Sequence, residues 1–397
     1  MGAGRVIREQ SEMTARSQFS VSNRRAVLGG MAGALSSSIF SPVFARAAKP
    51  SPSPTLIEAM ADTMTPGMAA IVIRDFRAEQ EMIAGARRLG RDEQVRVGDR
   101  WHLGSNGKAI TATLIARLVE KGALSWDAPL VELLPQFSDD MQQVYRDVTL
   151  PELLSHRAGL PENHEDMNLF NSFYEDAAST TEQRLRYLEA ALRDDPVGPV
   201  RGESSYSNTG YLLAAAAAER ATGEPFEDLI IAEVYHPLGI SSVSFEQFGG
   251  EGEPSGHVDG RIAEKTTDAN PRMFAPAGGM RMTMADWSKF CIDQLRGEHG
   301  DGRLLKEENY RFLHAPQGET RAALGWGASP TVMGLQGPAV VHSGSDGNWM
   351  ALVALFSETG NGVLVAANAG DSMGGDVAAK KALKSLATSV ADAAPAN

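Results

Sequence analysis

A single Ser-x-x-Lys tetrapeptide is the part of this sequence best suited to covalent chemistry. It consists of Ser105, Asn106, Gly107 and Lys108, and the pattern occurs once in the chain. A serine hydroxyl attacks a carbonyl only when a base within hydrogen-bond reach takes its proton. Residues three apart lie on the same face of a helix, so Lys108 can be that base. The spacing favours acyl transfer through Ser105, and the alternative is an N-cap serine followed by a solvated lysine.

The segment after the tetrapeptide favours the first interpretation. Residues from Ala109 to Val119 are apolar around a full helical turn, which predicts a buried helix that begins at Ser105. The free N–H groups and positive dipole of a helix N-terminus stabilise an oxyanion and destabilise the ammonium form of Lys108. Burial lowers the pKa of a lysine in the same direction. We therefore expect Lys108 to be an effective base.

Two further triplets follow in order along the chain: Tyr206, Ser207, Asn208 and His342, Ser343, Gly344. With the tetrapeptide they resemble the serine hydrolase family that includes class C β-lactamases, DD-peptidases and family VIII-type esterases. Supporting stretches begin at Leu153 (LLSHRAGLP), Tyr206 (YSNTGYLL), His236 (HPLGI) and Pro276 (PAGGMRMTMADWSKF). The resemblance covers nearly all of the chain beyond residue 55.

The resemblance implies catalytic roles for three residues. Ser105 would be the nucleophile and Lys108 its base, while Tyr206 would move protons and later activate the hydrolytic water. A tyrosine beside a lysine ammonium should ionise more easily than a free phenol. The backbone N–H groups of Ser105 and Ser345 would form the oxyanion hole.

The resemblance also implies substrate-binding residues. Asn208 would orient Lys108 and a substrate carbonyl, although it could also cap the helix that follows. His342, Ser343 and Gly344 would end a strand on the opposite wall of the cleft, where a glycine lets the substrate backbone approach. β-Lactamases of this family usually have lysine at the place of His342. Histidine is largely neutral near pH 7, so its attraction for a substrate carboxylate is weaker.

The implied fold is an α/β fold, an antiparallel sheet flanked by helices with a mostly helical insert and the active site in the cleft between them. Strand patterns occur at Met68–Asp75 and Glu81–Ala86, and return in three segments beyond Ala339. We therefore expect one hydrolase domain over residues 48–397. Its sheet part would span about 55–104 and 271–397, and its helical insert about 105–270.

The first 47 residues read as an export signal. Arg24 and Arg25 precede a modestly apolar stretch, and Ala45, Arg46 and Ala47 offer a cleavage site. The apolar stretch is too weak for a membrane-spanning helix, which needs about 20 strongly apolar residues. The sequence therefore predicts a cleaved twin-arginine-type signal peptide, no stable membrane anchor and a periplasmic or secreted protein.

The composition of the chain argues against nucleic acid as a partner and against a metal or other cofactor. Without the leader, 31 basic and 48 acidic side chains remain, a net charge of −17, which argues against nucleic-acid binding. The histidines show no metal-binding spacing, so we predict no metal and no cofactor. Cys291, the only cysteine, should be a small core residue. Glu162 and His164 are in a loop that could line the cleft, but exposed loop charges are usually solvated.

These features predict a periplasmic serine hydrolase that cleaves small esters or amides through an acyl-enzyme on Ser105. One alternative is a DD-carboxypeptidase or class C-like β-lactamase that acts on cell-wall peptides or β-lactams. Another is a penicillin-binding sensor that is acylated without turnover. A Gly-x-Ser-x-Gly elbow is absent from the sequence, which argues against an α/β-hydrolase.

Overall fold

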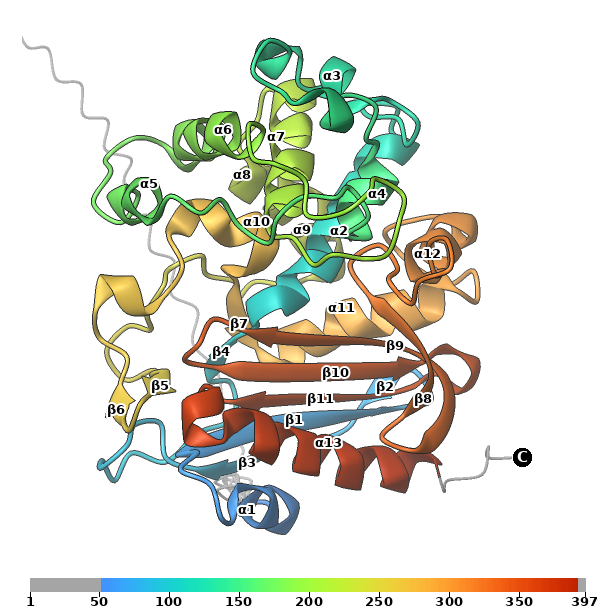
Figure 1. Cartoon of the computed structure of the whole chain (residues 1–397). Helices are drawn as coiled ribbons and strands as arrows, with labels where there is room; N and C mark the ends of the chain where they lie inside the picture. Colours follow the sequence, from blue (N-terminus) through green and yellow to red (C-terminus); the bar gives the residue numbers. More distant parts are fainter. Residues whose placement is uncertain (1–50, 392–397) are drawn as a thin grey trace, which may run out of the picture. The chain divides into compact units, whose positions relative to one another are not determined.

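The structure is a computed structural model that describes residues 51–391, and its centre is a seven-stranded antiparallel sheet (Figure 1). The strand order is β2-β1-β11-β10-β9-β8, and β3 also pairs with β1. The strands are β1 (Gly67–Arg74), β2 (Arg77–Ala78), β3 (Met82–Gly85), β8 (Gly327–Val332), β9 (Leu335–Ser345), β10 (Met350–Phe356) and β11 (Asn361–Ala367). The predicted signal peptide, residues 1–47, lies outside the described residues.

Side chains alternate along each central strand between two hydrophobic layers. In β1, Met68, Ala70 and Val72 belong to one layer, whereas Ala69 and Ile71 belong to the other. Helices α1 (Pro54–Met60) and α13 (Gly375–Ala391) cover the first layer, and α11 (Met284–Gly297) lies against the second (Figure 1). Because both faces are covered, the central strands are apolar throughout, as buried strands require.

Most of the remaining helices lie on the α11 side of the sheet (Figure 1). They are α2 (Gly107–Glu120), α3 (Leu130–Leu133), α4 (Leu150–Leu154), α5 (Met167–Ser172), α6 (Thr180–Ala191), α7 (Thr209–Thr222), α8 (Phe226–Ile230), α9 (His236–Leu238), α10 (Ala275–Gly278) and α12 (Glu307–His314). Two short ladders complete the described elements: β4 (Arg100–His102) with β7 (Arg281–Thr283), and β5 (His257–Val258) with β6 (Arg261–Ile262). Within residues 51–391, no helix is both long and apolar enough to cross a membrane.

Helix α2 begins with Gly107 and Lys108, the last two residues of the tetrapeptide, and is buried in the core. Residues from Gly107 to Ala116 along it are all buried, because α7, α10, α12 and the segment Ile231–Tyr235 pack against this helix. The predicted buried helix at Ala109–Val119 is therefore confirmed, as is the α/β fold class. Cys291, predicted to be a small core residue, is fully buried in α11.

Glu81, immediately before β3, is a buried carboxyl group with an incomplete set of partners. It is 7% exposed, its Oε2 atom accepts a hydrogen bond from the Gly98 N–H (3.3 Å), and its Oε1 atom has no partner. Burial, with a smaller contribution from the Asp99 carboxylate, raises the pKa of Glu81 to about 7. The side chain is therefore protonated in the fold at mildly acidic pH.

We expect Glu81 to make the protein less stable as the pH rises towards 8. A raised folded-state pKa contributes stability that is complete below the ordinary glutamate pKa and is lost as pH rises through about 7. Between pH 5 and 8 this loss amounts to at most about 2.5 kcal/mol. Urea unfolding of wild type and Glu81→Gln at both values should show a smaller decline for the variant. Equal declines would show that Glu81 titrates normally.

Candidate active site

Ser105 lies in a 3₁₀ turn, Gly104–Asn106, that leads directly into α2. The prediction that the α-helix begins at Ser105 is therefore wrong by one short turn. The Asn106 side chain fixes this turn by donating hydrogen bonds to the carbonyl oxygens of Leu103 (2.8 Å) and Ala351 on β10 (3.0 Å). Ser105 is therefore anchored both to its own helix and to the central sheet.

The turn that holds Ser105 presses against the end of β9. A Cβ atom on Gly104 would lie 2.3 Å from the backbone nitrogen of Ser345, and one on Gly344 would lie 2.1 Å from the Leu103 carbonyl oxygen and 2.6 Å from the Ser105 nitrogen. These distances are too short for any side chain. Gly344 is therefore required by the chain's own backbone, whereas we expected it to make room for the substrate backbone. The backbone nitrogens of Ser105 and Ser345 therefore both lie at this contact.

Lys108 is completely buried, and its Nζ atom contacts three oxygen atoms. They are Ser105 Oγ (3.1 Å), Asn208 Oδ1 (2.7 Å) and the Ala277 carbonyl oxygen (2.6 Å). The amide and carbonyl oxygens can only accept, so a neutral amine donates its two protons to them and turns its lone pair towards Ser105. Burial lowers the pKa of Lys108 to about 7, as expected from the sequence. Lys108 can therefore lose its proton, and so act as a base, at a much lower pH than an exposed lysine.

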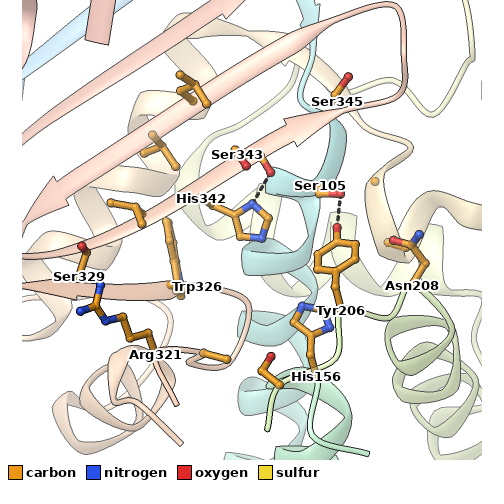
Figure 2. A pocket seen from close by; sticks show the side chains of 18 of the residues that line it. Ser105, His156, Tyr206, Asn208, Arg321, Trp326, Ser329, His342, Ser343 and Ser345 are labelled. Atoms are coloured by element: carbon orange, nitrogen blue, oxygen red, sulfur yellow. Dashed lines mark hydrogen bonds between the residues drawn. The ribbon is translucent and has the colours of Figure 1, made fainter. Parts of the chain in front are cut away.

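Tyr206 lies on the other side of the serine hydroxyl. Its hydroxyl donates a hydrogen bond to Ser105 Oγ at 2.5 Å, shown as a dashed line in Figure 2. Burial of the hydroxyl end and the negative charge of Glu162 raise the pKa of Tyr206 to about 12. The expectation that this phenol ionises more easily than usual is therefore wrong, because desolvation outweighs the hydrogen bond with Ser105, which lowers the pKa. Tyr206 is a neutral proton donor, and Lys108 is the base.

Asn208 connects Lys108 to the neighbouring loop. It occupies the N-cap position of α7, but its side chain makes no capping hydrogen bond. Instead, Oδ1 accepts from Lys108 and Nδ2 donates to Asn163 Oδ1 (3.0 Å). The structure thus places Asn208 beside the lysine, as the sequence suggested. Asn208 is also at the N-cap position, but its side chain does not cap the helix.

The end of β9 forms the opposite wall of the cleft. Pairing between β8 and β9 reaches Val341, while β9 pairs with β10 as far as Ser345. Strand β8 therefore does not pair with the backbone from His342 to Ser345. His342 lies opposite Val353, which faces the helical part, and Ser343 lies opposite Leu352, which faces α13. The ring of His342 points into the cleft, and the side chain of Ser345 points away from Ser105 (Figure 2).

His342 is neutral over most of the pH range. Burial, and secondarily the charge of Lys108, lower its pKa to about 4. Its Nδ1 atom lies 2.8 Å from the Ser343 carbonyl oxygen, which can only accept, so the proton is on Nδ1 and the Nε2 lone pair is free. The cleft therefore has no cation at this position.

The amino-acid sequence from residue 55 to residue 388 matches the family model described as Beta-lactamase. The chain belongs to the Beta-lactamase family. The match and the serine–lysine–tyrosine arrangement identify this member of the Beta-lactamase family as a serine hydrolase. In the part of the chain that the structure describes, no three histidine, cysteine, aspartate or glutamate side chains are grouped as a metal site.

Relatives of this Beta-lactamase family member include Penicillin-binding protein 4 of Amycolatopsis lactamdurans, which is 25% identical over 76% of this chain and 80% of the relative. An unguisins hydrolase of Aspergillus violaceofuscus is 26% identical over 57% of this chain, and the match spans 41% of that longer protein. Two solved structures share the fold at 21% identity. The octameric penicillin-binding protein homologue from Pyrococcus abyssi has a TM-score of 0.68 and coverages of 84% and 76% of the two chains. A D-stereospecific amidohydrolase from Streptomyces has a TM-score of 0.65, with coverages of 83% and 97%.

Several cleft residues were not identified from the sequence, among them His156 and Arg321. His156 packs its ring against that of Tyr206, with centroids 4.5 Å apart, and its Nδ1 atom accepts a hydrogen bond from the Ser207 N–H (3.0 Å). It lies in the stretch from Leu153 that supported the family resemblance, which was the only available signal. Arg321 lines the cleft beside Trp326 and Ser329, and no sequence pattern marks it (Figure 2).

Proposed function

We propose that this protein hydrolyses small ester or amide substrates through an acyl-enzyme on Ser105. The observation that carries the proposal is the position of Ser105 Oγ, between Lys108 Nζ at 3.1 Å and the Tyr206 hydroxyl at 2.5 Å. One group can remove a proton from the serine and the other can supply one to the leaving group. Acyl transfer to a serine requires a base and a proton donor in contact with its hydroxyl, and Ser105 has both.

Acylation begins when neutral Lys108 takes the proton from Ser105 Oγ as this oxygen attacks the substrate carbonyl carbon. The carbonyl oxygen becomes negative and is stabilised by the N–H groups of Ser105 and Ser345, each worth about 2.7–4 kcal/mol in comparable sites. The bond to the leaving group then breaks, and Tyr206 donates its proton to that group. Lys108 returns a proton to Tyr206, whose pKa of about 12 keeps it protonated between steps.

Deacylation repeats these transfers with water as the nucleophile. Lys108, through Tyr206, accepts a proton from the water as it attacks the ester carbonyl carbon of the acyl-enzyme. The bond to Ser105 Oγ breaks, the serine regains its proton and the acid leaves. Asn208 holds Lys108 Nζ in place during both half-reactions, because its Oδ1 atom accepts one amine proton at 2.7 Å.

Neutral His342 supports esters or neutral amides as substrates over β-lactams, which carry a carboxylate. A DD-carboxypeptidase or β-lactamase activity is the second candidate, favoured by the end of β9 beyond Val341, which β8 leaves unpaired and where a peptide backbone could bind. A third candidate, a penicillin-binding sensor, would be acylated once and recover slowly. p-Nitrophenyl esters, nitrocefin and D-Ala-D-Ala peptides tested on the purified protein separate these three, since a sensor gives a burst without steady turnover.

We expect His342→Lys to shift specificity towards β-lactams. A lysine ammonium would add a charge-assisted hydrogen bond to a carboxylate, worth about 1–3 kcal/mol, or roughly one to two orders of magnitude in specificity. The measured quantity is kcat/KM for nitrocefin divided by that for a short p-nitrophenyl ester, at one fixed pH. A pH titration of wild type is a poorer test, because His342 charges only near pH 4, where Lys108 is already protonated. If the ratio is unchanged or falls, residue 342 does not select by charge.

We also propose that the protein is exported to the periplasm or beyond, with residues 1 to about 47 removed. The arginine pair at Arg24 and Arg25 and the Ala45, Arg46, Ala47 site support this. Changing both arginines to lysine should leave uncleaved precursor in the cytoplasm, as detected by fractionation and mass spectrometry of the N-terminus. Normal export of that variant would rule out the twin-arginine route.

A further inference from the structure

Glu162 lies on the cleft wall next to the catalytic groups. It is an exposed residue that lines the cleft together with Ser105, Tyr206 and Asn208. Its negative charge opposes the lowering of the Lys108 pKa by burial and adds to the raising of the Tyr206 pKa, which places the carboxylate within electrostatic range of the reacting atoms. The sequence alone suggested a solvated loop charge without a role.

The backbone around Glu162 is attached to the catalytic segment by three hydrogen bonds. The Ser207 hydroxyl donates to the Pro161 carbonyl oxygen (2.7 Å), and the Asn208 N–H donates to the Glu162 carbonyl oxygen (2.8 Å). The third runs from Asn208 Nδ2 to Asn163 Oδ1. Because these bonds join the loop to Ser207 and Asn208, the backbone of Glu162 is held beside the catalytic segment.

The carboxylate of Glu162 has no cationic partner among the described residues. None of the ion pairs within residues 51–391 includes it, although the neighbouring His164 pairs with Asp194. Arg321, the cleft arginine, lies near Ser329 on the other side of His342 from Tyr206 (Figure 2). A negative charge on the cleft wall next to the nucleophile attracts cations and repels anions.

From this geometry we infer that Glu162 selects substrates that carry a positively charged amine close to the scissile carbonyl. The inference rests on the proposed hydrolysis through Ser105 and specifies its substrate class. It is consistent with neutral His342, since neither residue attracts a carboxylate to this part of the cleft. A free ammonium beside the carbonyl would form a charge-assisted hydrogen bond with the Glu162 carboxylate.

A pair of isosteric esters tests this inference. In p-nitrophenyl glycinate, the protonated amine occupies the place of the terminal methyl group of p-nitrophenyl propanoate. The two esters differ in intrinsic reactivity, so the informative quantity is the glycinate-to-propanoate ratio of kcat/KM, compared between wild type and Glu162→Gln at pH 6.5. We expect this ratio to fall about five- to tenfold in the variant, as for one partly solvated charge pair.

Glu165→Gln is the matched control, because Glu165 is an exposed glutamate of the same loop that does not line the cleft. Its ratio should stay within about twofold of wild type. The inference is overturned if wild type hydrolyses the propanoate ester but the glycinate-to-propanoate ratio of kcat/KM is the same in wild type and Glu162→Gln. That result leaves the proposed function intact. The inference is also overturned if the ratio falls equally in Glu162→Gln and Glu165→Gln, because the total charge of the loop would then be the cause. Turnover of neither ester by wild type overturns the proposed function and this inference with it.

Discussion

Ser105→Ala should lower kcat/KM for any hydrolysed ester by at least about a thousandfold, the scale seen when the nucleophile of a serine hydrolase is removed. The Ser105 hydroxyl is the group that Lys108 and Tyr206 both contact, so its loss leaves the two proton-transfer groups with nothing to activate. The turn is fixed by the side chain of Asn106, so the fold should be unaffected. Intact-protein mass spectrometry with a slowly hydrolysed ester should show an adduct on wild type and none on the variant.

Ser204→Ala provides the matched control for this experiment. Ser204 also lines the cleft, but its hydroxyl donates to the Ser155 carbonyl oxygen (3.4 Å) and has neither the lysine nor the tyrosine as partner. Its replacement should retain both turnover and the adduct. An adduct that persists in Ser105→Ala would assign the covalent chemistry to another residue.

The pairing of Ser105 with Lys108 could be predicted, because it depends only on residues that are close together in the sequence. Lys108 is three positions after Ser105, and any helix through that segment brings the two side chains together. The burial that lowers the pKa of Lys108 also followed from the sequence, since the helix after it is apolar on all sides. The central strands were found for the same reason, because the apolar character of each strand is a property of its own segment.

The predictions that were wrong concern properties that depend on contacts between segments distant in the sequence. The pKa of Tyr206 is set by packing around its hydroxyl and by Glu162, which is 44 positions away in the sequence. The need for glycine at 344 comes from the approach of Leu103 and Ser105 on another element. Likewise, His156 and Arg321 are recognisable as cleft residues only after the chain has folded, because neither belongs to a spaced motif of its own.

The pH profile of kcat/KM should rise through about pH 7 and then level off. This parameter reports the titration of the free enzyme, and the neutral form of Lys108 is the active base. Below its pKa, each pH unit removes about nine tenths of that form, so the rate at pH 5 should be roughly a hundredfold below the plateau. Initial rates with p-nitrophenyl propanoate, corrected for spontaneous hydrolysis, give the profile.

An inflection near pH 7 can be assigned to Lys108 because the neighbouring groups titrate elsewhere. The pKa of His342 is lowered to about 4 and that of His156 to about 3, while that of Tyr206 is raised to about 12. Lys108→Met should therefore remove the inflection and lower the plateau by about a thousandfold. Lys121→Met, at an exposed lysine paired with Glu233, should change neither. A wild-type profile that rises only near pH 10 would mean that Lys108 remains an ammonium at neutral pH, and one that is flat from pH 5 to 8 would mean that Lys108 does not titrate near 7; either result overturns this prediction.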